Sequence, residues 1–188
     1  MKEKIKFKNT LNKKFSIKWI LTILIWTFAI SIIINSVSSG LMPSLNIAGA
    51  FVVLILLIFM GIIFDIIGIA VATATEIPFH SMSTKNVRGS KQSIMLIKHS
   101  EKVTSFCNDV VGDITGIISG SAAAIIISRI TYNSVKSAVL SIALTAFVAS
   151  LTVGGKALGK TLAMRRANAI VYKVGVLIYY IQKLFRKI

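Results

Sequence analysis

No charged side chain occurs between Lys18 and Asp65, a stretch too long for a single membrane-crossing helix. Asn, Ser, Gly and Pro residues interrupt it over 35–46, which predicts a loop there. The apolar segments on either side are Trp19–Ser36 and Ala48–Thr75. About 20 apolar residues cross a bilayer core, so we expect two transmembrane helices joined by this loop.

Two more apolar segments follow, Val110–Ile130 and Ser137–Gly155. The fold class we predict is all-α: a polytopic membrane protein with four transmembrane helices plus cytoplasmic amphipathic helices. A cleaved signal peptide is the alternative interpretation of the first segment. Its apolar core is longer than the usual core of about 7–15 residues, so we expect a retained anchor.

Composition and charge placement exclude other classes. The chain has 55% hydrophobic and 15% charged residues, which is too apolar for a disordered protein. Its single cysteine, Cys107, cannot form a disulfide within the chain. The net charge of +16 would suit nucleic-acid binding, but the basic residues flank the apolar segments. We therefore expect them to contact a lipid bilayer with anionic headgroups, and we expect no nucleic-acid partner.

The basic residues also predict an orientation. Of the 22 Lys and Arg residues, seven lie in 1–18, five in 76–108 and eight after Gly155, which leaves only Arg129 and Lys136 elsewhere. Four spans place these three segments on one side of the membrane, and positive charge favours the cytoplasmic side. We expect a multi-pass protein of the cell membrane with both termini in the cytoplasm. The Ile- and Lys-rich usage favours a bacterial source.

Basic and apolar residues alternate at helical spacing in Thr84–Phe106 and Ala167–Ile188. We expect each to form an amphipathic helix on the membrane surface. A fifth span is the alternative for the second segment, but Lys173 interrupts its short apolar core. The predicted domains are a basic N-terminus (1–18), an extra first helix with an outer loop (19–47), a three-helix unit (48–166) and a juxtamembrane helix (167–188).

Small residues recur every four positions in the last two spans. Gly112, Gly116 and Gly120 form such a series in the third span, and Gly154 ends one in the fourth. Smooth strips of this kind let helices approach closely in lipid. We expect close packing between the third and fourth spans, with a homodimer contact as the alternative.

Ionisable residues inside spans are the candidate functional groups. Asp65, Glu76, Asp109 and Asp113 are four of only six acids and lie in or beside the spans. A carboxylate at the centre of a membrane helix costs roughly 2.5–3.5 kcal/mol on insertion scales, so it usually has a partner or a watery cavity.

Thr73 and Thr75 add hydroxyl oxygens near the end of the second span. Carboxylate, hydroxyl and amide oxygens suit a hard cation such as Mg²⁺. The alternative is that the acids pair with nearby Lys156, Lys160 or Arg88. His80, His99 and Cys107 match no zinc spacing. With no Ser–His–Asp order, phosphate loop or nucleotide fingerprint in the sequence, we expect neither an enzyme nor a nucleotide cofactor.

Three stretches, in this order, resemble the transmembrane domain of the cyclin M and CorB/CorC-type magnesium transporters. Residues 73–76, Thr-Ala-Thr-Glu, are similar to the family's Ser-x-Ser-Glu signature. Residues 108–111, Asn-Asp-Val-Val, resemble its Gly-Asn-x-x-Val-Asn stretch. Residues 155–163, Gly-Lys-Ala-Leu-Gly-Lys-Thr-Leu-Ala, resemble its Gly-Glu-x-x-Pro-Lys-Thr-x-Ala stretch. The likeness covers about residues 48–188, and the first span is extra.

The resemblance implies a dimeric three-helix domain that binds Mg²⁺ through serine hydroxyls, an asparagine and a glutamate. By position, Thr73, Thr75 and Asn108 keep oxygen ligands, whereas Lys156 stands at the glutamate. An ammonium has no lone pair and repels a divalent cation. Gly159 replaces the proline and Gly112 the second asparagine. The family's nucleotide-binding regulatory domains have no counterpart in these 188 residues.

Two functional hypotheses remain. In the first, the chain is a divergent divalent-cation transporter or binding protein whose cavity lies between the second, third and fourth spans, with Asp109 and Asp113 as substitute carboxylates. In the second, it is a non-transporting membrane interaction or scaffold protein. There Lys156 neutralises Asp65 or Asp113 and keeps a degenerate ion site closed.

Overall fold

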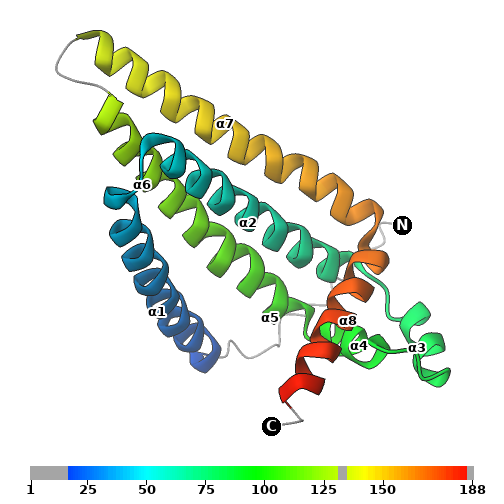
Figure 1. Ribbon diagram of the computed structural model, residues 1–188. Helices are drawn as coiled ribbons and strands as arrows, with labels where there is room; N and C mark the ends of the chain where they lie inside the picture. The colour runs from blue at the N-terminus through cyan, green and yellow to red at the C-terminus, as the bar shows by residue number, and fades with distance from the viewer. Residues whose placement is uncertain (1–16, 131–134, 186–188) are drawn as a thin grey trace, which may run out of the picture.

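The computed structural model describes residues 17–130 and 135–185, and all of its regular structure there is helical (Figure 1). Its elements in chain order are α1 (Ile17–Leu41), the short 3-10 helix η1 (Met42–Ser44), α2 (Ile47–Thr73), α3 (Ile77–Thr84), α4 (Ser90–Lys98), α5 (Ser100–Thr104), the π-helical segment η2 (Ser105–Gly112), α6 (Asp113–Ile130), α7 (Val135–Arg165) and α8 (Ala167–Phe185).

Four helical stretches are long and apolar enough to cross a membrane. They are α1, α2, the continuous stretch Ser100–Arg129 and, within α7, Ser141–Arg165. The prediction of an all-α protein with four transmembrane helices is confirmed. Helix α8 is not among these stretches, which agrees with its interpretation as a surface helix. The chain is therefore a multi-pass membrane protein.

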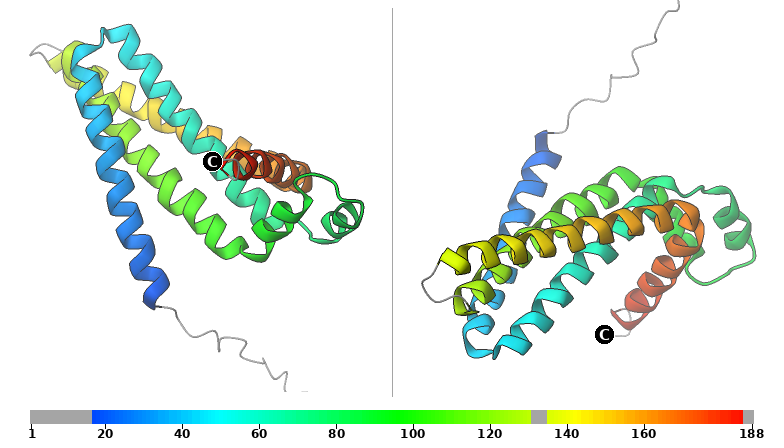
Figure 2. Two further views of the ribbon diagram at one scale, coloured as in Figure 1. Left: turned by 60° about the horizontal axis from the view of Figure 1, so that its bottom comes forward. Right: turned by 90° about the horizontal axis from the view of Figure 1, so that it is seen from above.

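Helix α2 lies at the centre of the bundle. It contacts α6, η2 and α7 along its length, and α1 packs on the far side of α6 (Figures 1 and 2). Leu54 of α2 and Ile114 and Ile118 of α6 belong to its buried core. Large side chains such as Phe59 and Phe147 point outward and are exposed. So much exposed apolar surface would be anomalous in water, but acyl chains cover it in a bilayer.

The turn between the first two spans is shorter than predicted. Helix α1 continues through the Ser-rich stretch as far as Leu41, and η1 follows at once. The guanidinium of Arg129 donates to the carbonyls of Met42 (2.7 Å) and Leu45 (2.9 Å), and Asn46 Oδ1 accepts the N–H of Gly49 at the start of α2 (2.8 Å). These bonds satisfy two backbone carbonyls and one backbone N–H of the turn, so a short connection is sufficient between the two helices.

The segment expected to form one amphipathic helix over Thr84–Phe106 is broken instead. Helix α3 ends at Thr84, and α4 begins after Gly89, whose φ of +84° is open to glycine at little cost. The third span begins at Ser100 rather than Val110, because α5, η2 and α6 run on without a gap. The first turns of this helix are polar, so its hydropathy alone indicates a later start.

The surface helices form a compact layer at one end of the bundle. Helix α8 crosses the end of α2 and packs on α4, beside α3 (Figure 2). The Ser93 hydroxyl, fully buried, contacts the carbonyls of Gly89 (3.0 Å) and Val171 (3.2 Å). A side chain at Gly175 would collide with Ser93. This layer contacts the end of α2, where Thr73 is the last helical residue and Thr75 follows.

The glycine series does not pack the third span on the fourth. A Cβ atom added at Gly116, Gly120 or Gly154 would have no other atom within 4 Å. Helices α6 and α7 do contact each other, as expected, but not through these three glycines. Of that series, Gly112 alone lies against another helix, where it faces Asp65 of α2. The homodimer alternative stays a prediction.

Candidate functional site

Asp65 lies inside α2, eight residues before its last residue, Thr73. At a rise of about 1.5 Å per residue, this places it about 12 Å from the helix end. It is only 9% exposed. Space for its carboxylate comes from a glycine, because a Cβ at Gly112 would collide with Asp65 Oδ1. Because Gly112 of η2 has no side chain, the carboxylate of Asp65 can occupy the space beside it.

Lys156 supplies the counter-charge from α7. Its Nζ lies 3.0 Å from Asp65 Oδ2 and donates to the Gly112 carbonyl at 3.4 Å. The exposed fractions are 29% for the Lys156 side chain and 12% for that of Asp65. A buried carboxylate of this kind is usually paired with an opposite charge. The ammonium therefore sits between two oxygens contributed by α2 and η2.

Two further glycines seat α7 against α2 on either side of this pair. A Cβ at Gly155 would collide with Ile62, and one at Gly159 would lie 2.8 Å from Ile66 Cγ1. Gly155 and Gly159 are four residues apart and so share one helix face. In the sequence resemblance, Gly159 stands only at the position of the family's proline. Its spacing from Gly155 was the available signal for a packing role.

Asn108 lies on the same interface in η2. A Cβ at Gly68 would collide with Asn108 Oδ1, which places the amide against α2 one turn beyond Asp65. Among the described residues, this buried Oδ1 has no hydrogen-bond partner. Nearby, the Thr104 hydroxyl donates to the Gly68 carbonyl (3.0 Å). π-Helical turns are frequent at functional sites, and here one carries an acceptor that the protein leaves unsatisfied.

The two threonines lie outside this cluster. The Thr73 hydroxyl donates to Ile69 O within its own helix at 2.8 Å and is exposed. Thr75 joins the end of α2 to α8 instead: its N–H donates to Asn168 Oδ1 (3.0 Å), and Asn168 Nδ2 donates to its hydroxyl (3.3 Å). The expectation that Thr73 and Thr75 share a ligand set with Asp65 is not met in this structure.

The remaining predicted acids are also separate. Glu76 pairs with His80 at 3.1 Å, rather than with Lys156, Lys160 or Arg88. Asp109 and Asp113 are exposed and stand on the face of the third span opposite to buried Val110, Val111 and Ile114. Throughout residues 17–130 and 135–185, no three His, Cys, Asp or Glu side chains come together as a metal group.

In comparisons with known proteins, no family model, curated protein or solved structure matches the chain. The resemblance to the CorB/CorC-type transporters rests on the three sequence stretches alone and stays a prediction.

The chemistry of the site follows from its donors. The Asp65 carboxylate, the Gly112 carbonyl and the Asn108 amide are hard oxygen donors of the type that bind Mg²⁺. With Lys156 in place, the carboxylate is already compensated, and a divalent cation does not fit beside the ammonium. The described arrangement is a closed one, in which the lysine holds the position of a cation.

Proposed function

We propose that this protein binds a divalent cation within the membrane, and transports it, at a site where the Lys156 ammonium is the resting counter-ion. The observation that carries the proposal is the position of Lys156 Nζ between Asp65 Oδ2 and the Gly112 carbonyl. Ionisable residues at membrane depth are usually retained for a transport or relay role, because a buried ion pair contributes little net stability.

The mechanism is an exchange of charges at Asp65. At 4 Å and an effective dielectric constant of 20, two unit charges interact by about 4 kcal/mol. Lys156 and an arriving cation therefore cannot share the carboxylate, and cation entry drives the ammonium out. The Lys156 side chain already reaches partial exposure, 29%, which gives it a route out of the interior. Asn108 Oδ1, unpartnered on the same interface, is the natural additional ligand.

The second candidate is a non-transporting membrane interaction protein with a degenerate site closed permanently by Lys156. One observation favours it: Asp109 and Asp113 are exposed and bring no substitute carboxylate to Asp65. Under this hypothesis the ion pair is structural, and no cation replaces the lysine.

Mg²⁺ uptake into liposomes that contain the purified protein separates the two candidates. Transport predicts uptake by the wild type, loss of uptake in Asp65→Asn, and unchanged uptake in the control Lys160→Gln, which alters an exposed lysine one turn further along α7. Absence of uptake by the wild type, together with Mg²⁺ binding by Lys156→Glu, would establish the degenerate site. Absence of both would refute any cation role.

We also infer that the end of the bundle carrying α3, α4 and α8 faces the cytoplasm, which places both termini there in the cell membrane. The support is the concentration of Lys and Arg in the segments that flank this end. Release of Mg²⁺ into, or capture from, the cytoplasm would then occur at this end of the bundle.

A further inference from the structure

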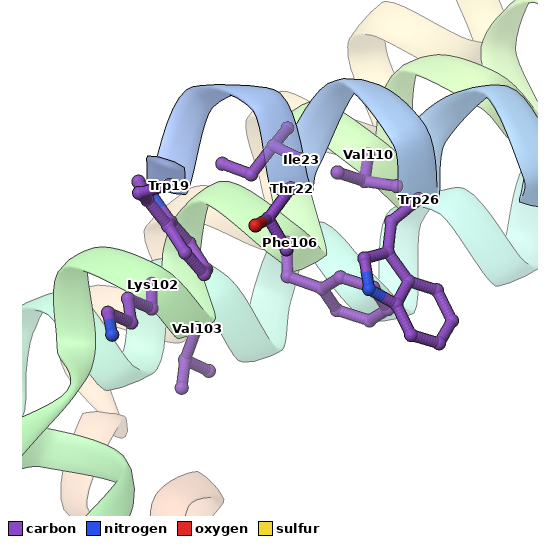
Figure 3. A pocket seen from close by; sticks show the side chains of 8 residues that line it. All are labelled: Trp19, Thr22, Ile23, Trp26, Lys102, Val103, Phe106 and Val110. Carbon is purple, nitrogen blue, oxygen red and sulfur yellow. The ribbon is translucent and has the colours of Figure 1, made fainter. Parts of the chain in front are cut away.

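A groove separates the first span from the start of the third. Trp19, Ile23 and Trp26 of α1 form one wall, and Val103 and Phe106 lie on the other (Figure 3). The cavity has a volume of about 380 Å³. Both tryptophans of the chain lie in this wall. No step of the proposed cation mechanism uses this groove.

The groove is polar at one end only. Lys102 stands there, with its Nζ 4.9 Å from the centre of the Trp19 ring, a cation–π contact (Figure 3). Lys18 is exposed on the turn of α1 next to Trp19. Glu101, also exposed, is the acid beside Lys102. Among the described residues at this end, Lys18 and Lys102 outnumber Glu101, so an anionic group is favoured there.

The remaining lining offers little to a polar ligand. Thr22 is the other polar side chain in the lining, and its hydroxyl donates to the Lys18 carbonyl of its own helix (2.7 Å). An occupant must therefore be apolar along its length and anionic at one end. Trp19 lies where an apolar span meets a basic segment, the depth at which tryptophans and lysines meet lipid headgroups.

We propose that this groove is a binding site for an anionic phospholipid of the surrounding membrane. One acyl chain lies between α1 and η2 against Trp26 and Phe106, and the phosphate lies beside Lys102 and Lys18. The site lies between the first span and the facing residues of α5 and η2. It is independent of the Asp65 site and of the proposed function.

Tryptophan fluorescence tests the site directly, because both tryptophans line it. The protein is reconstituted in phosphatidylcholine vesicles with a small, equal fraction of either phosphatidylglycerol or phosphatidylcholine brominated on its acyl chains. We expect brominated phosphatidylglycerol to quench the tryptophan fluorescence at least about twofold more strongly than brominated phosphatidylcholine does. Lys102→Gln should remove this preference, while Lys102→Arg should keep it, since the charge is retained.

Lys160→Gln is the matched control, since it removes an exposed lysine from α7, away from the groove. It should leave the preference unchanged. Equal quenching by the two lipids in the wild type would overturn the proposal, and so would an undiminished preference in Lys102→Gln. Weak quenching by both lipids that strengthens on dilution of the protein would show that a second copy of the chain fills the groove, which also contradicts it.

Discussion

Lys156 Nζ of α7 lies 3.0 Å from Asp65 Oδ2 of α2, in the interior of a membrane bundle. This pair connects the last span to the central one at the level where the chain has glycines at 112, 155 and 159. Each of these glycines lets a neighbouring helix or side chain approach that a Cβ would obstruct. The packing of the bundle and the chemistry of its candidate site therefore depend on the same residues.

The pair should behave as a unit in stability measurements. Asp65→Asn or Lys156→Gln alone leaves an uncompensated charge, which we expect to lower the free energy of unfolding by about 1–3 kcal/mol. The partial exposure of Lys156 keeps the loss below that of a fully buried pair. The double variant should recover most of it. Loss of helicity on titration with SDS measures these values, and two single variants as stable as the wild type would contradict the pairing.

Helix α7 should respond sharply to the position of an added side chain. Gly159→Leu places its side chain against Ile66, and overpacking of this kind costs about 1–3 kcal/mol. Gly154→Leu is the matched control, because a Cβ there meets nothing within 4 Å. The same SDS titration compares the two. Ile66→Ala should rescue Gly159→Leu by opening space, and equal stabilities of the two glycine variants would show that α7 does not pack on α2 as described.

Substitution of Asn108 should impair Mg²⁺ uptake more than it lowers the stability of the protein. Its Oδ1 is buried without a partner, so Asn108→Leu removes a desolvation penalty and should leave stability equal or higher. Thr104→Val, on the same interface, loses a hydrogen bond to Gly68 O and should cost about 1 kcal/mol. Mg²⁺ uptake should fall in Asn108→Leu. A strongly destabilised Asn108→Leu would show that the oxygen has a structural role instead.

The orientation can be tested with single cysteines in a Cys107→Ala background, since the chain has no other cysteine. Arg88 and Ser44 are both exposed, at opposite ends of the bundle. On intact cells, a membrane-impermeant maleimide should label Ser44→Cys and should label Arg88→Cys only after the cells are opened. The reverse pattern would invert the topology.

Most of the fold follows from the sequence because a bilayer demands long uncharged helices. Two boundaries did not. Gly40 and the serines before it are typical of a loop, yet they belong to α1. The helix can continue through them because Arg129 donates hydrogen bonds to the backbone carbonyls of the turn that follows. The third span begins earlier than its hydropathy indicates, because Lys102 and Asp109 lower the mean hydropathy of a helix that continues through them.

The candidate site was predictable only in part. Asp65 and Lys156 stood out as charges in apolar surroundings, but which acid would meet the lysine depends on helix rotation. The π-helical turn shifts that rotation between Ser105 and Gly112, so the facing of Asp109 and Asp113 could not be read from spacing. The groove around Trp19 cannot be predicted from sequence patterns, because its walls come from segments far apart in the chain.

The most direct test of the account is the affinity of the purified protein for Mg²⁺, measured by calorimetry for the wild type, Lys156→Gln and Asp65→Asn. The Lys156 ammonium and a bound cation should repel each other by more than about 1.4 kcal/mol. Removing the ammonium should therefore tighten Mg²⁺ binding at least about tenfold. We predict tighter binding in Lys156→Gln than in the wild type and none in Asp65→Asn. No measurable binding in Lys156→Gln, or undiminished binding in Asp65→Asn, would contradict the claim that lysine and cation compete for Asp65.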